Sequence, residues 1–160
     1  MAITIRSTRE TDAPALYRLW QVLREYNAAT DVRITPAAVS ESDFTVAVVD
    51  IVRRESSAAF VATSDQALLG FVSGGLEAYQ PDRLPERFAT IGYLFVDPAA
   101  RRQGIAGQLV TAMVGWARTR PDVSHMEMSV LAADAQAAAF WRATGFSPFI
   151  ERLWMPLTAS

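Results

Sequence analysis

A strand end, a tight turn and a helix start follow one another within residues 96–106. The first turn of a helix carries backbone N–H groups without intrahelical partners and the positive end of the helix dipole, so a phosphate placed there meets aligned donors. Gly104 and Ala106 leave room for close approach, and Arg101 and Arg102 can add charge-assisted contacts. A capped surface helix whose two arginines face water would give the same pattern, so the turn alone leaves both interpretations open.

This turn resembles the signature of the GNAT acetyltransferases, Arg/Gln-x-x-Gly-x-Gly/Ala, which Arg101–Ala106 matches, as does the preceding Leu94–Pro98. A second motif of that family, Asn-x-x-Ala-x-x-aromatic-Tyr followed by Gly-Phe, is similar to Asp134–Trp141 and then Gly145-Phe146. The two motifs occur in the family's order. With the first helix and the hairpin described below, the resemblance covers nearly the whole chain, although residues 28–54 are generic.

The resemblance implies one α/β domain over residues 1–160: a mixed central sheet with a splay between its two central strands and helices on both faces. It also implies acetyl-CoA as the acyl-donor cosubstrate. The pantetheine arm would run through the splay and make strand-like hydrogen bonds to Phe95 and Val96. The pyrophosphate would lie on the amides of the turn from Gln103 to Ala106, and the second motif would flank the acyl end. The implied cosubstrate-binding residues are Phe95, Val96, Arg101, Arg102, Gln103, Gly104, Ile105, Ala106, Asp134, Ala137, Phe140 and Trp141.

The residues that would catalyse transfer depart from the family pattern. The second motif carries Trp141 where the family often has a tyrosine acid, and an indole N–H donates a hydrogen bond without usefully transferring a proton. We therefore expect Trp141 to be a packing wall around the thioester, with water protonating the thiolate. The strand segment before the turn, residues 90–93, also lacks the family's carboxylate.

Three other residues are candidates for proton transfer. Glu77 ends one strand, Glu127 lies on the strand across the expected splay, and Tyr93 could relay a proton through water. A carboxylate that is solvated or paired with the lid loop is the alternative for Glu77 and for Glu127, and a core position is the alternative for Tyr93. His125, the single histidine of the chain, is expected to be a surface or strand-cap imidazole without a catalytic role.

Hydrophobic periodicity and turn residues predict the elements that position these side chains. Thr35-Pro36 is read as a helix start, Gly70, Gly74 and Gly75 suggest a bulge, and a proline-containing loop over residues 78–87 is a candidate substrate lid. The predicted strands are residues 3–6, 58–63, 67–77, 88–96, 125–131 and 150–157, and the predicted helices begin near residues 11, 35, 104 and 134.

Composition excludes several other classes of protein. The chain has no cysteine and one histidine, which rules out disulfides, thiolate metal sites and a histidine-rich metal site, and no metal is implied. A net charge of −2 with scattered basic residues makes nucleic acid an unexpected partner. No apolar run approaches the ~20 residues of a membrane span, and residues 1–10 show no secretion signal, so we expect a cytoplasmic protein that does not partner a membrane.

The acceptor is expected to lie among aromatic and acidic residues that suit a cationic amine, namely Trp20, Tyr26, Asp31 and the loop Tyr79–Arg87. The leading hypothesis is direct transfer of an acetyl group from acetyl-CoA to a primary amine of a small molecule. A protein or peptide amine acetyltransferase and a non-catalytic acyl-CoA binding or sensing domain remain as alternatives. The sequence leaves the acceptor's identity and the acyl-chain preference open.

A homodimer is a further expectation from the resemblance, because members of this family often pair through their C-terminal strands. Phe149, Leu153, Trp154 and Met155 form an apolar tail that would otherwise be partly exposed. Burial in the chain's own core explains the same residues equally well.

Overall fold

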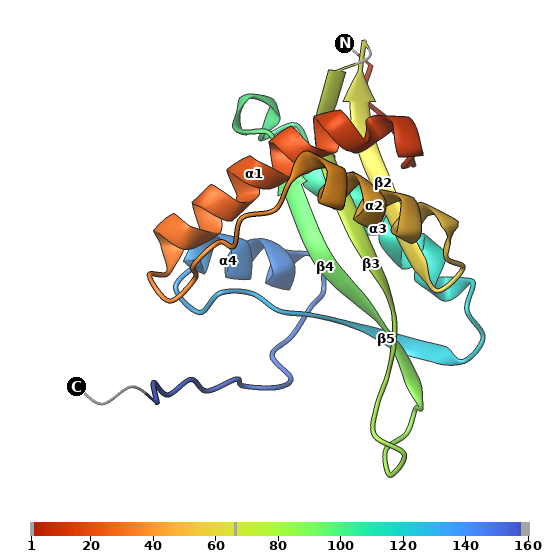
Figure 1. Cartoon of the computed structure of the whole chain (residues 1–160). Helices are drawn as coiled ribbons and strands as arrows, with labels where there is room; N and C mark the ends of the chain where they lie inside the picture. The colour runs from red at the N-terminus through yellow and green to blue at the C-terminus, as the bar shows by residue number, and fades with distance from the viewer. Residues whose placement is uncertain (1, 66, 158–160) are drawn as a thin grey trace.

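The computed structural model of the chain describes residues 2–65 and 67–157 (Figure 1). Short 3-10 turns at Glu10–Asp12 and Pro98–Ala100 precede α1 and α3. The strands are β1 (Thr4–Ser7), β2 (Ser57–Ser64), β3 (Ala67–Ala78), β4 (Arg87–Val96) and β5 (Val123–Met128), and the helices are α1 (Ala13–Thr30), α2 (Glu41–Arg53), α3 (Ile105–Arg118) and α4 (Ala135–Ala143).

The five strands form one mixed sheet in the order β1-β2-β3-β4-β5. Strands β1 to β4 are antiparallel to their neighbours, whereas β5 runs parallel to β4 and is reached through the crossover helix α3. Helices α1 and α2 cross one face of the sheet and α3 covers the other (Figure 1). The predicted mixed α/β sheet with helices on both faces is confirmed.

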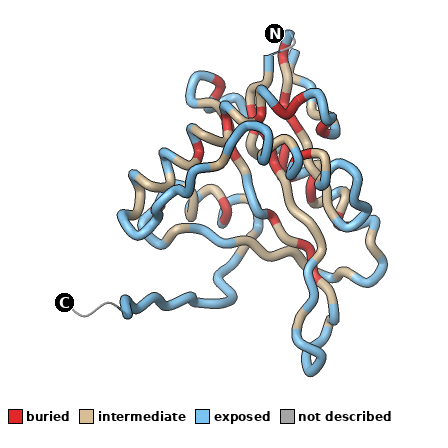
Figure 2. Tube along the Cα trace, viewed as in Figure 1, coloured by how far each residue is buried: buried red, intermediate tan, exposed pale blue. Residues whose placement is uncertain are grey.

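Each face of the sheet has its own hydrophobic core. Val61, Phe71 and Phe95 point toward α1 and α2, where they pack with α1 residues such as Leu16. On the other face α3 and α4 cover a larger cluster in which Leu109 and Met113 are fully buried. Figure 2 shows the buried residues concentrated on the strands and on the inward sides of these helices. The two cores hold the sheet between rigid layers.

The sheet opens between β4 and β5. Ser73 pairs with Tyr93 and Gly74 pairs with Ile91, so Gly92 is an extra residue that bends β4. Strand β5 pairs with β4 only from Arg87 to Ile91. Beyond the bulge, residues 94–96 of β4 have no β5 partner, which confirms the predicted splay.

Two predicted elements differ from the structure. The second helix begins at Glu41, where the Ser40 side chain caps it by accepting from the Asp43 N–H at 3.1 Å, and not at Thr35-Pro36. The predicted last strand, residues 150–157, is absent, because this segment pairs with no strand of the described sheet and its side chains are exposed. No helix in the described part of the chain is long and apolar enough to cross a bilayer.

Candidate functional site

The turn before α3 has the backbone of an anion-binding concavity. Arg102 and Gly104 both have left-handed backbones, with φ of 65° and 73°, and Gly104 is the N-cap of α3. Alternation of left-handed with right-handed or extended residues turns successive N–H groups toward one hollow. A Cβ placed on Gly104 would meet no atom within 4 Å, so the space in front of the helix N-terminus is open. The predicted turn therefore has both the donors and the room for a phosphate.

Arg101 is held against the open end of β4. Its Nε donates to the Val96 carbonyl oxygen at 3.2 Å, and its guanidinium lies 5.8 Å from the centroid of the Phe95 ring. This contact uses one of the five N–H donors of the guanidinium. Arg102 and Gln103, which follow, are exposed. The positive charge of Arg101 is thus fixed at the mouth of the splay.

The open edge of β4 is formed by the backbone of Leu94 and Val96. The Asp97 N–H donates to the Leu69 carbonyl of β3 at 2.8 Å, and backbone groups alternate direction along a strand. The backbone groups of Phe95 therefore face β3, and its ring is buried on the α1 side. The expectation that Phe95 offers strand-like hydrogen bonds to the splay is corrected by this alternation, whereas Val96 keeps that orientation.

The second motif builds the N-terminus of α4 and a buried aromatic group. Asp134 caps the helix by accepting from the Ala137 N–H at 2.9 Å. The Trp141 ring is 7% exposed and meets the rings of Phe140 and Phe146 edge-on, each at 5.2 Å between centroids. It packs with α3 in the core of that face, so its side chain serves packing.

The three predicted proton-transfer residues share the sheet face covered by α1. Strand alternation places Glu77 of β3 and Tyr93 of β4 on the face of the buried Phe71 and Phe95. Glu127 of β5 pairs with Thr90 on that face, next to the start of the splay. Burial raises the pKa of the Glu127 carboxyl, and the charge of Glu77 raises this pKa further. The structure thus brings the two carboxylates together, with Tyr93 farther along β4.

Tyr79 and His125 complete the surroundings of Glu127. The Tyr79 hydroxyl donates to Glu127 Oε1, and His125 Nε2 lies 3.0 Å from the same oxygen and 2.9 Å from the Tyr79 hydroxyl. The His125 ring is stacked on Phe88 at 5.9 Å. The sequence led us to expect a surface or strand-cap imidazole at His125, and its contacts with Glu127 and Tyr79 were missed. Its spacing of two residues from Glu127 on a strand was the available signal, because such residues share a face.

The predicted acceptor residues on α1 do not meet in one pocket. Trp20 packs on Phe44 of α2 at 4.8 Å, the Tyr26 hydroxyl donates to Asp134, and Asp31 pairs with Arg33. The loop after β3 does reach the Glu127 surroundings, through Tyr79 at its start.

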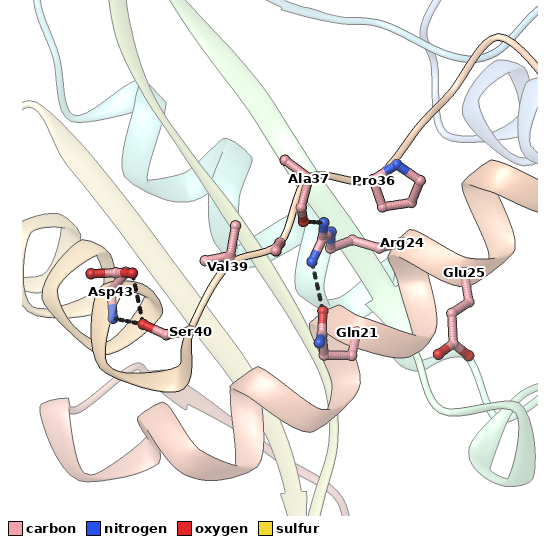
Figure 3. A pocket seen from close by; sticks show the side chains of 9 residues that line it. Gln21, Arg24, Glu25, Pro36, Ala37, Val39, Ser40 and Asp43 are labelled. Carbon is pink, nitrogen blue, oxygen red and sulfur yellow. Dashed lines mark hydrogen bonds between the residues drawn. The ribbon is translucent and has the colours of Figure 1, made fainter.

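A separate hollow of about 750 Å³ lies between α1 and residues 36–43 (Figure 3). Figure 3 shows Arg24 reaching from α1 to the Ala37 carbonyl and to Gln21, whose Oε1 it meets at 2.8 Å. None of the predicted catalytic or cosubstrate-binding residues lines this hollow. Its contacts hold the α1–α2 connection, and we place no chemistry there.

Comparison with known proteins finds a family model that covers most of the chain. Residues 16–146 match the family model described as the acetyltransferase (GNAT) family. No curated protein sequence matches the chain.

Solved structures share the fold at low sequence identity. The aminoglycoside N-acetyltransferase AAC(6')-Iy in complex with CoA is 17% identical with a TM-score of 0.80, over 99% of this chain and 96% of that chain. A mutant of the BH1408 protein from Bacillus halodurans is 20% identical with a TM-score of 0.83, over 97% and 99%. The aminoglycoside 6'-N-acetyltransferase AAC(6')-Ih from Acinetobacter baumannii is 16% identical with a TM-score of 0.77, over 99% and 100%.

Proposed function

Because the chain belongs to the GNAT acetyltransferase family, we propose that it transfers an acetyl group from acetyl-CoA directly to a primary amine of a small molecule. The observation that carries this proposal is the opening of the sheet beside Val96 with the N-terminus of α3 at its end. The similar AAC(6')-Iy has been solved with CoA and with the bisubstrate analogue CoA-S-monomethyl-acetylneamine, which supports both the donor and direct transfer.

The pyrophosphate of acetyl-CoA binds the turn from Gln103 to Ala106. The open space at Gly104 and the left-handed residues around it suit a phosphate, and Arg101 and Arg102 add positive charge at the rim. The pantetheine arm lies along the edge of β4 that β5 leaves open, where the backbone groups of Leu94 and the N–H of Val96 are its partners, since the Val96 carbonyl accepts from Arg101. On the α3 face, Trp141 of the second motif forms the wall beside the acyl group, together with Ala137 and Phe140 of the same motif.

Glu127 is the general base. A base works best when its pKa lies near the working pH, and both burial and the neighbouring Glu77 move the pKa of Glu127 upward from its ordinary range. Glu127 takes a proton from the ammonium form of the acceptor, and the neutral amine then attacks the thioester carbonyl. As the C–S bond breaks, the amide nitrogen gives up its second proton to water and the departing thiolate takes a proton from water. The carboxylate of Glu77 and the aromatic rings nearby also favour a cationic amine at this position.

A small-molecule acceptor is supported by the similar aminoglycoside N-acetyltransferases, whose names give small amines as acceptors. The test is calorimetric titration with acetyl-CoA, followed by thiol release against small amines and lysine-containing peptides. Binding with thiol release for a small amine supports the proposal. Release only with peptides points to a protein acetyltransferase, and binding without release points to a sensing domain. Absence of binding overturns the proposal.

The second partner that we propose is another copy of the chain. The apolar residues of the tail, including Phe149, Leu153 and Trp154, are exposed, and Figure 1 shows this blue segment running away from the sheet. In the described sheet β5 pairs on one side only, so its outer edge presents unpaired backbone groups. The tail of one copy pairing with the β5 edge of the other covers both features.

A further inference from the structure

Glu127 has one carboxylate oxygen held by two neighbours. The Tyr79 hydroxyl and His125 Nε2 both meet Oε1. Tyr79 starts the loop after β3, and His125 lies two residues before Glu127 on β5. Their contacts leave Oε2 of Glu127 for another partner.

We propose that Tyr79 and His125 are positioning residues, which fix the Glu127 carboxylate so that Oε2 faces the acceptor amine. This inference rests on the proposed function, because it needs Glu127 to be the base. A carboxylate free to rotate presents its lone pairs to the amine for only part of the time, whereas two bonds to one oxygen set its plane. The two residues act through Glu127 and touch no reacting atom.

Stacked rings hold the two positioning residues in place. The centroid of the Tyr79 ring lies 4.2 Å from that of Phe88 and 6.0 Å from that of His125, and the three rings are nearly parallel. Neither donor can swing away from Glu127 without breaking this stack. The stack therefore turns two flexible side chains into a fixed support.

Tyr79 also connects the base to the loop of residues 79–86. Its N–H donates to the Glu86 carbonyl at 3.0 Å and closes the base of the loop, and the Arg83 guanidinium lies 4.0 Å from its ring centroid. The charged and titratable groups facing Glu127 are thus Glu77 from β3, Tyr79 with the neighbouring Arg83 from the loop, and His125 from β5. The loop that we expect to be a substrate lid therefore begins with Tyr79, one of the two residues that position Glu127.

The test compares kcat and kcat/KM across pH for four variants of the full chain with the best amine acceptor. Tyr79→Phe keeps the stack but removes the donor, so kcat falls about tenfold while the KM for acetyl-CoA stays unchanged. The Tyr79 bond favours the charged carboxylate, so its loss also moves the acidic limb to higher pH. Tyr17→Phe, which removes a hydroxyl bonded to the Val39 carbonyl, is the matched control.

His125 is tested by a pair of substitutions. His125→Phe keeps a ring on Phe88 and removes the polar contact, so kcat falls, whereas His125→Gln restores an N–H donor and recovers most of the lost kcat. A role in the fold alone would show equal losses in both variants with a shared drop in the unfolding midpoint. Equal pH profiles for the wild type and for Tyr79→Phe and His125→Phe would overturn the proposal.

A second measurement needs no turnover. The chain has one histidine, so its ring ¹⁵N resonances are assigned without ambiguity. Glu127→Gln and Tyr79→Phe should move the Nε2 resonance, and Tyr17→Phe should leave it unchanged. If the wild type acetylates no amine but these resonances move, the proposed function fails while the contact stands. Unmoved resonances in an active enzyme overturn the positioning inference alone.

Discussion

The Tyr26 hydroxyl donates to Asp134 Oδ2 at 2.8 Å and so joins α1 to the N-terminus of α4. The other oxygen of Asp134 accepts from the Ala137 N–H, so this buried carboxylate has both oxygens engaged. Helix α4 lies on the α3 face of the sheet, whereas α1 crosses the opposite face. The bond therefore connects helices that lie on the two opposite faces of the sheet.

Tyr26→Phe should lower the free energy of unfolding by about 0.5–1 kcal/mol. The low end of the usual range applies because the Tyr26 ring is 37% exposed. Asp134→Ala should cost more, about 2 kcal/mol, because it also removes the cap of α4. Asp134 raises the pKa of Tyr26, so this stability is present at neutral pH and is lost as the pH rises through the folded-state pKa of the tyrosine.

Urea unfolding at neutral and strongly alkaline pH measures both effects. Tyr93→Phe is the control, since Tyr93 is 46% exposed and its hydroxyl makes no hydrogen bond to the residues that the structure describes. A Tyr26→Phe protein as stable as the wild type at neutral pH would show that the bond contributes nothing.

Gly104→Asn should weaken acetyl-CoA binding about tenfold by filling the space where the pyrophosphate lies. Asparagine tolerates the left-handed backbone that Gly104 adopts, so the fold should survive the change. Gly115→Asn is the matched control, because it adds the same side chain to α3, also into open space, about 16 Å farther along the helix. Calorimetry that finds equal affinities for the two variants would remove the basis for placing the phosphate at this turn.

Glu77→Gln should extend activity to lower pH. The pKa of Glu127 is raised first by burial and second by the charge of Glu77, so removing that charge lowers the pKa and keeps the base ionised further into the acidic range. The measurement is the acidic limb of kcat/KM against pH. Glu55→Gln removes a charge from the turn before β2 and should leave the limb in place. An acidic limb at the same pH in Glu77→Gln and in the wild type would show that Glu77 does not affect the pKa of the base.

Trp141→Phe should reduce stability more than catalysis. The indole is buried among Phe140, Phe146 and α3, so the smaller ring leaves a gap that costs about 1–3 kcal/mol. If the thiolate takes its proton from water, kcat should stay within about threefold of the wild type, less than the effect of removing a positioned acid. Stopped-flow thiol release together with thermal unfolding separates the two effects. A kcat loss of 100-fold or more, about the least expected for a catalytic acid, in a folded protein would make Trp141 catalytic.

Local signals in the sequence predicted most elements correctly. The β2–β3 hairpin, α3 and α4 follow from hydrophobic periodicity and from turn or capping residues next to them. The predicted start of the second helix at Thr35-Pro36 was wrong, although these two residues are typical of a helix start. The Val39 carbonyl accepts from the Tyr17 hydroxyl of α1, and the Ala37 carbonyl accepts from Arg24 of α1 (Figure 3). These two bonds hold the segment out of a helix. Such a contact between distant residues leaves no local signal.

In the candidate site, too, features set by neighbouring residues could be predicted, whereas contacts between distant residues could not. The anion-binding turn could be predicted because its donors are adjacent in the sequence. Glu77 was found at a strand end and Glu127 on the strand across the expected splay, but the effect of one carboxylate on the other depends on β3 and β5 both flanking β4. The contact of Tyr79 with His125 also requires the loop between β3 and β4 to lie against β5, and no residue spacing in the sequence predicts this.

The tail should make the protein dimeric, and charge placed on it should make the protein monomeric. Leu153 and Trp154 are 84% and 60% exposed, so paired Leu153→Asp and Trp154→Asp changes cost the single chain little but would bury two charges in an interface. Sedimentation equilibrium should find dimers for the wild type at micromolar concentration and monomers with an unchanged unfolding midpoint for the double variant. Val32→Asp, at an apolar position that is 93% exposed outside the tail, should remain dimeric. A wild type that is monomeric under these conditions would leave the tail without the partner that we propose, because apolar exposure alone would then be a property of the free chain.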